Sequence, residues 1–455
     1  MGRKKLSMEI INSHAAGIDV GSRSHDVAVG QFTDDVKEFG VYAQDLTAIG
    51  KWMKSKEITT VAMKSTGDYW QNLFAELVEQ GFEVVLVNGK FTKHAKGKKT
   101  DVKDCRWIQL HTLGLLSGSF LPDETTEKLR TYCRQRGNWV DQAASTAHKM
   151  QKFLKFLNFR LDVVVKDVCG LTGLAIIGDI CKGNLDPMQL AKHRYYNCKK
   201  SEEEIAKALH GNNREDFLFG LKQEYEIYLF LQKKINECDQ QMEKVIVTAL
   251  KKFPAKRALK TTEKPHKRIN KNAPKIKNLN QVAYQYFEGV DLLAIEGLSH
   301  ATVLAIMGEI GPEGFKKFES AKHFTSWLRL APNNKISGGK ILSHRIPKGS
   351  NRLKIALRQA ANSIGNLKDT HLSNFFKRVA FRKGRTAAVS ATARKLAVIV
   401  WNMMVKKVPY LPPTEYLFLD QKRKLKLVTH LKKNIAKLEL KPEDLGFSPT
   451  LVSTN

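Results

Sequence analysis

Short strand patterns alternate with helical patterns between residues 15 and 116, and this alternation constrains the fold more than any other feature of the chain. The strand patterns are AAGIDVGS, HDVAVGQF, KEFGVYA, TTVAMKS and FEVVLVN, and helical spacing appears near 44–56 and 69–80. Strand signals that alternate with helix signals, one pair of them separated only by a polar turn, are typical of an α/β domain. We therefore expect an α/β domain with a mixed sheet over residues 1–122.

The chain after Pro122 has helical spacing of its apolar residues over a long distance. From Tyr228 onward, apolar or small residues recur in alternating steps of three and four, at Leu231, Ile235, Cys238, Met242, Val245 and Ala249. This repeat predicts a coiled coil within a helical region over 123–250, used as a spacer or as a dimer seam. The alternative is an ordinary amphipathic helix that packs within its own chain.

The charge balance points to a polyanionic partner. The 455 residues leave room for several domains, and 76 Lys+Arg against 45 Asp+Glu give a net charge of +31. Nucleic acid is the first candidate, and an anionic membrane surface is the rival. Because neither a long apolar run nor an apolar signal core at the start is present, we expect no membrane partner and a cytoplasmic, nucleoid-associated protein. The six cysteines form no CxxC pair and are expected to be reduced thiols.

The most basic stretch lies in a predicted linker over 251–289. Residues 251–280 contain eleven Lys+Arg and one acidic residue, Glu263, with few large apolar groups. Such a segment buries too little apolar surface to fold by itself, so it is either a solvated loop or a nucleic-acid contact. The candidate contacts are Lys256, Arg257, Lys267 and Arg268. A second helix-rich domain is expected over 290–405, followed by a basic tail over 406–455.

Three carboxylates form a candidate metal site. Asp19 lies within the strand pattern AAGIDVG, where a charged side chain is costly unless it is paired or bound to a metal ion. Asp101 and Asp104 are three residues apart at the start of a predicted helix and project from one face of its first turn. Converging carboxylates suit Mg²⁺, and two such ions can activate a phosphodiester. As alternatives, Asp101 caps a helix, or GIDVGS is the phosphate loop of an actin-like ATPase.

A second candidate centre is Ser337 in NNKISGGK, which precedes Gly338 and Gly339. A small hydroxyl beside two glycines can reach a phosphate without steric obstruction, and nearby cations can stabilise the transition state. The cations are Lys335, Lys340, Arg345, Lys348 and Arg352. Taken alone, the pattern favours a plain turn serine. Upstream, Gly297 and Ser299 before a helical run resemble the phosphate-binding turn of a helix-hairpin-helix.

With these motifs in place, the chain resembles the transposases of the insertion sequence 110 family, the DEDD recombinases that work with a bridge RNA. One block comprises GIDVGSRSHDVAV, AMKSTGDYW, GFEVVLVNGK and KTDVKDCRWI. The other comprises LLAIEGLSHATVLAIMGEIG, FTSWLRLAPNNKISGGKILSHRIPKGSNRLKIALRQAA and TAAVSATARKLAVIVWNMM. The resemblance implies a RuvC-like (RNase H-like) domain, then a helical C-terminal transposase domain.

The resemblance also implies residue roles. Asp19, Asp101 and Asp104 match the first, third and fourth acidic positions, which would hold Mg²⁺. Lys64 departs from the pattern, because it stands where the family has Glu in a Glu-x-Thr-Gly motif; Asp68 is a nearby substitute. Ser337 matches the nucleophilic serine of the family.

The implied function is a DNA transposase that cuts and rejoins donor and target DNA through a transient phosphoserine link. A structured guide RNA would select the DNA by base pairing, and a homodimer would pair into a tetramer. Two rivals remain within nucleic-acid biochemistry. One is a metal-only junction-resolving nuclease that does not need Ser337, and the other is an RNA- or DNA-binding protein that lost catalysis through Lys64.

Overall fold

The chain divides into two compact units, residues 1–121 and 122–455. A computed structural model describes residues 10–29, 35–65, 67–88, 111, 113–116, 118–251, 272–343, 345–349, 351–368, 370–411, 417–440 and 444. The finer division into five segments remains an interpretation of the sequence.

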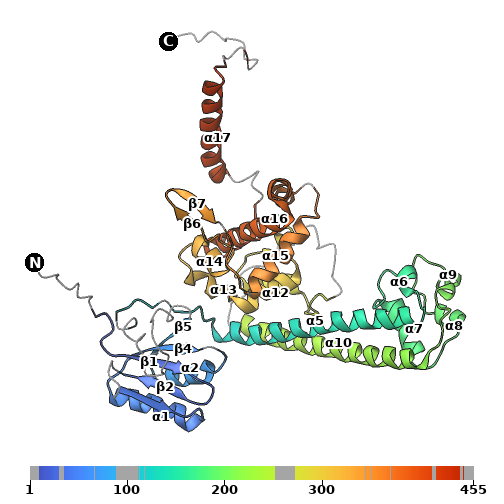
Figure 1. Cartoon of the computed structure of the whole chain (residues 1–455), viewed down its shortest axis with the longest axis horizontal. Coiled ribbons are helices and arrows are strands. Elements are labelled where there is room, and N and C mark those ends of the chain that lie inside the picture. The colour runs from blue at the N-terminus through green and yellow to red at the C-terminus, as the bar shows by residue number, and fades with distance from the viewer. Residues whose placement is uncertain are drawn as a thin grey trace, which may run out of the picture. The chain divides into compact units, whose positions relative to one another are not determined.

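The first unit contains the expected mixed sheet (Figure 1). Its strands are β1 (Ala15–Val20), β2 (His25–Ala28), β3 (Val36–Phe39), β4 (Thr60–Ser65) and β5 (Glu83–Asn88). Their order is β3-β2-β1-β4-β5. The two hairpin-connected pairs are antiparallel, and β4 pairs parallel with both β1 and β5. The central strand β1 is therefore hydrogen-bonded on both edges, as a buried apolar strand requires.

Two helices cover one face of this sheet. α1 (Ala43–Ser55) and α2 (Trp70–Glu79) bury apolar residues every three or four positions, and these pack with Ile18, Val61 and Met63 of the central strands. Because successive side chains of a strand point to opposite faces, Asp19, which follows Ile18, and Lys64, which follows Met63, lie on the face away from α1 and α2. The fold thus separates an apolar face from a face that carries charge.

Two histidines are buried in this unit. His25 of β2 is 3% exposed, and its Nδ1 has no hydrogen-bond partner among the described atoms. His111 is 4% exposed, and its Nε2 lies 3.2 Å from the hydroxyl of Thr60. Burial lowers the pKa of both imidazoles below the ordinary value of 6.5. Both rings are therefore held in the neutral form near physiological pH.

We expect the first unit to lose stability as the pH falls below about 6.5. In the unfolded chain both histidines take up protons near that pH, whereas the lowered pKa values of the folded state delay uptake. Their stabilising contribution is complete above the unfolded pKa and decreases as the pH falls toward the folded pKa. Thermal unfolding between about pH 7.5 and pH 5.5 measures the effect. A His25→Gln/His111→Gln double variant should depend less on pH; an equal slope in both proteins would contradict the prediction.

Two long helices dominate the first part of the second unit. α5 (Glu124–Phe156) and α10 (Glu215–Leu250) pack against each other along their length (Figure 1). The repeat in α10 faces this contact: Leu231, Ile235, Cys238, Met242 and Ala249 are buried and Val245 is half-buried. The seam is therefore covered within the chain, which was the alternative to a dimer seam. Four short helices complete the described part of this region: α6 (Leu161–Val164), α7 (Leu171–Ile180), α8 (Pro187–Ala191) and α9 (Glu202–Lys207).

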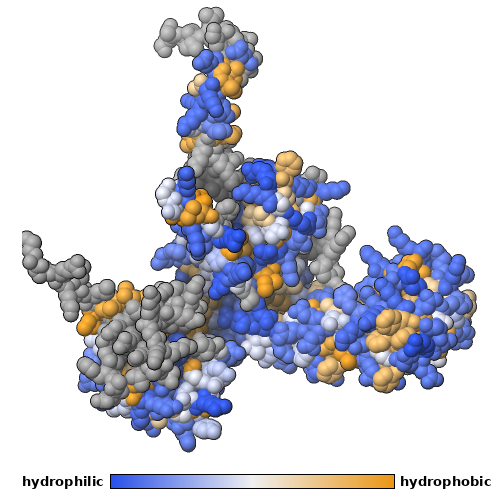
Figure 2. Space-filling model, viewed as in Figure 1, coloured by the Kyte–Doolittle hydropathy of each residue, from blue (hydrophilic) through white to orange (hydrophobic). Residues whose placement is uncertain are grey.

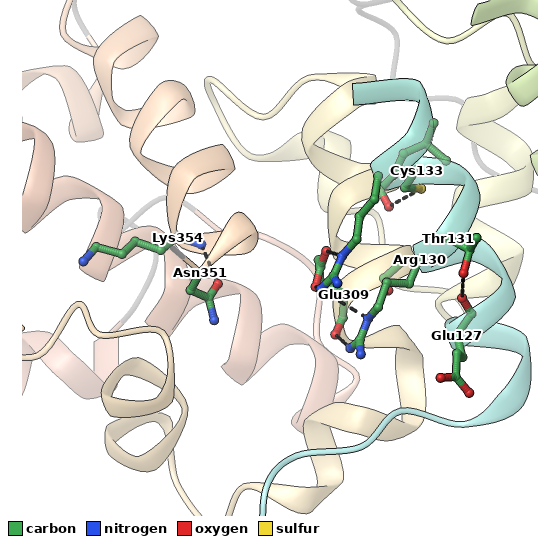
Figure 3. A network of polar contacts seen from close by, with 10 residues as sticks. Glu127, Arg130, Thr131, Cys133, Glu309, Asn351 and Lys354 are labelled. Carbon is green, nitrogen blue, oxygen red and sulfur yellow. Dashed lines mark hydrogen bonds and ion pairs between the residues drawn. The ribbon is translucent and has the colours of Figure 1, made fainter. Parts of the chain in front are cut away.

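The rest of the second unit is mostly helical, and one of its helices packs on α5. Its elements are α11 (Leu279–Tyr286), η3 (Leu292–Ala294), α12 (His300–Glu309), α13 (Gly311–Gly314), η4 (Phe315–Lys317), α14 (Ala321–Trp327), β6 (Lys335–Ser337), β7 (Lys340–Ser343), α15 (Arg352–Ile364), α16 (His371–Lys406) and α17 (Leu417–Lys437). Arg130 and Arg134 of α5 bind Glu309 at the end of α12, and Figure 3 shows Arg130 beside Glu309. Arg134 makes two hydrogen bonds of 2.9 Å to the carboxylate, and Arg130 donates to the main-chain oxygen. This bidentate geometry fixes α12 on α5.

Helix α16 is long and apolar enough to cross a membrane by length and composition alone, and among the described helices it is the one that meets this test. The sequence pattern did not predict such a span. However, 56% of its apolar window is buried inside the protein. Ala393, Leu396 and Ala397 are fully buried, as expected of a core helix.

Candidate nucleic-acid interface and catalytic residues

An ion pair stands at the centre of the sheet in the first unit. The parallel register of β1 and β4 places Lys64 beside Asp19, and Lys64 Nζ donates to Asp19 Oδ2 at 2.7 Å. The side chains are 13% and 24% exposed, so solvent screens the pair only in part. The lysine therefore does not turn its ammonium away from the acid; it neutralises the first of the predicted metal ligands.

A further carboxylate shares this face and was missed by the sequence analysis. The antiparallel register of β1 and β2 places Asp26 opposite Asp19. Directly opposed residues of neighbouring strands project from the same face, so Asp26, Asp19 and Lys64 form a row across β2, β1 and β4. The short turn between the two strands could have predicted this pairing. The Gly21 N–H donates to the Ser24 carbonyl and closes the turn, and this sets the register that places Asp26 opposite Asp19.

The described residues of this row do not fit a divalent cation. Carboxylate oxygens that bind Mg²⁺ need a free lone-pair direction, and the ammonium of Lys64 occupies one such direction of Asp19. Within the described ranges, no three acidic, histidine or cysteine side chains lie close enough together to hold a metal ion. Asp101 and Asp104 lie outside the described residues, as do the linker candidates Lys256, Arg257, Lys267 and Arg268.

Ser337 lies at the end of an exposed β-hairpin. It is the last residue of β6 and pairs with Lys340, the first residue of β7. Gly338 and Gly339 form the two-residue connection with φ values of +53° and +74°, which glycine adopts without strain. Apart from the adjacent residues, no heavy atom in the described part of the chain lies within 4 Å of a Cβ built on either glycine, so the turn is open on that side. The hydroxyl of Ser337 is therefore accessible to a large substrate such as a DNA strand.

The predicted cations lie in this hairpin or follow it in the sequence. Lys335 and Lys340 belong to its strands, Arg345 follows β7, and all three are exposed. The main-chain oxygen of Arg345 accepts a bond of 3.0 Å from Asn333 N, which closes the base of the hairpin. Exposed Lys348 and Arg352 lead into α15. Since opposed residues share a face, Lys340 is the cation whose side chain projects beside Ser337.

The opposite face of the hairpin is apolar. Ile336 pairs with Ile341, and these side chains are 62% and 58% exposed. Figure 2 shows an apolar patch where Figure 1 places β6 and β7, on a surface that is otherwise mostly hydrophilic. An isolated two-stranded ribbon with this pattern is suited to contact a partner rather than to remain in solvent.

The turn at Gly297 has a structural role in this protein. Gly297 has φ +81°, and a Cβ there would lie 2.4 Å from Ile364 Cγ1 of α15. Ser299 caps α12 by accepting a bond from Thr302 N. The turn is therefore followed by a capped helix, whereas the helix-hairpin-helix and its binding to phosphate remain predictions.

The described cysteines are free thiols in the structure. Burial raises the pKa of Cys133 to about 12 and that of Cys181 to about 11. These thiols are therefore protonated at neutral pH and make poor nucleophiles.

Family comparisons agree with this arrangement. Residues 16–159 match a family model described as Transposase, that of the IS110 DEDD transposases. The chain thus contains a transposase domain of a class that cuts and rejoins DNA. Residues 291–377, which include the Ser337 hairpin, match the model of the transposase IS116/IS110/IS902 family. Two separate segments of the chain are therefore similar to transposases of the IS110 type. No curated protein matches the chain.

Proposed function

We propose that this transposase breaks and rejoins DNA with Ser337 as its nucleophile. The observation that carries the proposal is the presentation of Ser337 on an exposed hairpin, next to an unobstructed two-glycine turn and opposite Lys340. A buried turn serine would have favoured a structural role instead. The match of this segment to the transposase family supports the assignment.

In the proposed reaction, Ser337 Oγ attacks a backbone phosphorus and loses its proton to solvent. The bond between phosphorus and one deoxyribose oxygen breaks, and that oxygen takes up a proton as the free strand end. The hydroxyl of a second strand then attacks the phosphoserine and releases Ser337 unchanged. Lys340, which shares the face of Ser337, stabilises the additional negative charge in both transition states.

The proposed partners are donor DNA, target DNA and a structured guide RNA. The net charge of +31 supports polyanionic ligands, and the family resemblance supplies the guide RNA and the pairing of homodimers into a tetramer. Mg²⁺ at Asp19, Asp101 and Asp104 belongs to the same resemblance. Because the Lys64–Asp19 pair does not fit a divalent ion, no step of the reaction is assigned to the metal.

Sequencing of the nucleic acid that co-purifies with the protein tests the proposed partners. The protein is expressed together with the DNA that surrounds its gene. We expect one structured RNA to be enriched over total cellular RNA, with segments complementary to the two DNA partners. If RNA and DNA are recovered in proportion to their cellular abundance, the binding of a guide RNA is contradicted. The co-purified nucleic acid would then be bound through non-specific charge attraction alone.

A second function is favoured by the ion pair itself. With Lys64 bound to Asp19, the first unit can hold nucleic acid without metal-dependent cleavage, so a purely binding protein is the rival. The two functions differ in one product. The transposase forms a covalent adduct between Ser337 and a DNA strand, whereas the binding protein forms none.

Nucleic-acid affinity should decrease steeply with salt. Phosphate contacts release counterions, so log affinity falls linearly with log salt, with a slope of about −0.9 per neutralised phosphate on duplex DNA. Replacing Lys256, Arg257, Lys267 and Arg268 with Gln should make this slope shallower by several units. Fluorescence anisotropy with a DNA duplex over a range of NaCl concentrations measures it. An unchanged slope would show that the linker is a spacer without phosphate contacts.

A further inference from the structure

Phe381 of α16 is a large aromatic side chain that is almost entirely in solvent. It is 94% exposed, more than any other large apolar side chain in the described part of the chain. An aromatic ring buries roughly 150–250 Å² when it finds a partner, so leaving one in water forgoes a large favourable contribution. Phenylalanine has no polar group that could compensate. The position therefore calls for a ligand or a partner.

The exposure of Phe381 does not come from a loose chain end. Five residues before it, Phe376 is 3% exposed, and seven residues after it, Ala388 is fully buried. Arg385 binds Asn362 of α15 at 2.8 Å and stacks its guanidinium 5.5 Å from the ring centre of Phe376. The protein thus anchors the helix on both sides of Phe381 and still presents the ring to solvent.

A backbone break accentuates this presentation. Gly384 has φ 79° and ψ 165°, which interrupts the helical geometry inside α16. Nothing in the described part of the chain lies within 4 Å of a Cβ built on Gly384, so the break faces open space. If the helix continued straight, its next turn would follow directly after the turn that carries Phe381. The break therefore leaves Phe381 at the end of a helical segment.

The surroundings of Phe381 are strongly cationic. Lys377 and Arg378 precede it by four and three residues, which places them on the same helix face, and both are exposed. Arg382 and Lys383 follow it and are exposed as well. The sequence contains no Asp or Glu between Asp369 and Glu415, so this stretch holds no acid that could neutralise the cations.

We propose that Phe381 is a platform on which an unpaired nucleobase stacks, while the neighbouring cations bind the flanking phosphates. An unpaired nucleotide combines the apolar π-face of its base with the negative charge of its phosphate. This combination matches an exposed aromatic ring within a group of Lys and Arg. A second copy of the same surface would bring like charges together. The bases of a fully paired duplex are stacked on each other and do not present a face to the ring.

This inference rests on the proposed function and deepens it, because it names where a single-stranded segment contacts the protein. The chemistry is shared by two sources. One is a loop or junction of the guide RNA, and the other is a DNA strand that is displaced when the guide pairs with its complement.

The test compares three probes of one sequence: a single-stranded RNA, a single-stranded DNA and the DNA duplex, each with 2-aminopurine at one position. Co-purified nucleic acid is first removed from the full-length protein with nuclease and high salt. Phe381→Ala should weaken single-strand binding about tenfold and reduce the quenching of 2-aminopurine, and it should leave duplex affinity unchanged. Phe381→Trp should retain both properties, because indole also stacks.

Phe219→Ala is the matched control. Phe219 is 67% exposed on α10, in a helix whose first turn carries Glu215 and Asp216, so its loss should change no probe. A loss confined to the RNA assigns the platform to the guide, and a loss confined to single-stranded DNA assigns it to the displaced strand. If Phe381→Ala left the affinity for single strands unchanged, or weakened duplex binding equally, the stacking platform would be overturned. The proposed function would not be affected by that outcome. If the wild-type protein bound no probe in a salt-dependent manner, the proposed function would fail with it.

Discussion

Lys64→Glu should convert the charged row of the first unit into a metal-binding site. At an effective dielectric near 20, a unit charge about 4 Å from a divalent ion contributes roughly 8 kcal/mol, so replacing repulsion by attraction has an upper bound of about 16 kcal/mol. Solvent and rearrangement reduce this value, and we expect Mg²⁺ or Mn²⁺ affinity to rise by at least about tenfold. Calorimetric titration measures the change, and strand cleavage should rise with it.

The ion pair also predicts the behaviour of the variant without metal. The carboxylate introduced by Lys64→Glu would stand directly beside Asp19 across β1 and β4, where like charges destabilise a sheet. This variant should therefore melt at a lower temperature than wild type in chelator, and Mn²⁺ should restore part of the loss. Lys64→Gln removes the ammonium without adding an acid and is the matched control. Equal metal affinity in wild type and Lys64→Glu would show that this row is not a metal site.

The fold of the first unit could be predicted because its signals are local. Alternating apolar residues in short runs define strands, and the helix patterns near 44–56 and 69–80 correspond to α1 and α2. The mixed sheet followed from these local patterns, whereas the order and the pairing directions of the strands were given by the structure. These patterns depend on neighbours in sequence, which the chain itself displays.

Partners that are distant in sequence could not be predicted in the same way. The apolar repeat of α10 indicates that one face of the helix is buried. It does not indicate whether that face packs against a second chain or against α5 of the same chain, which is what the structure has. The residue pattern likewise could not decide whether Lys64 turns away from Asp19 or binds it. That outcome depends on the register of β1 and β4, which brings two residues 45 positions apart into one row.

Ser337→Ala should abolish strand exchange and leave folding and nucleic-acid binding nearly intact. The hydroxyl is on an exposed hairpin beside a turn with open space, so its removal should change the free energy of unfolding by no more than about 0.5 kcal/mol. The loss of a nucleophile removes the covalent step itself, and we expect strand exchange to fall by at least about a thousandfold. Denaturing gels with labelled DNA should show the protein–DNA adduct with the serine protein and no adduct with the alanine variant.

The comparison is strongest in a Lys64→Glu background, because a wild-type protein restrained by the Lys64–Asp19 pair could make too little adduct for its loss to be seen. Ser343→Ala is the matched control, since Ser343 lies in β7 of the same hairpin and pairs with Lys335. This variant removes a serine hydroxyl from the same hairpin, one that accepts a hydrogen bond of 3.4 Å from Arg345 N, and should retain the adduct. A metal-only nuclease would cut equally well with or without the Ser337 hydroxyl and would form no adduct in either case. Undiminished cleavage by Ser337→Ala would therefore exclude the serine mechanism and favour a junction-resolving nuclease built on the acidic residues alone.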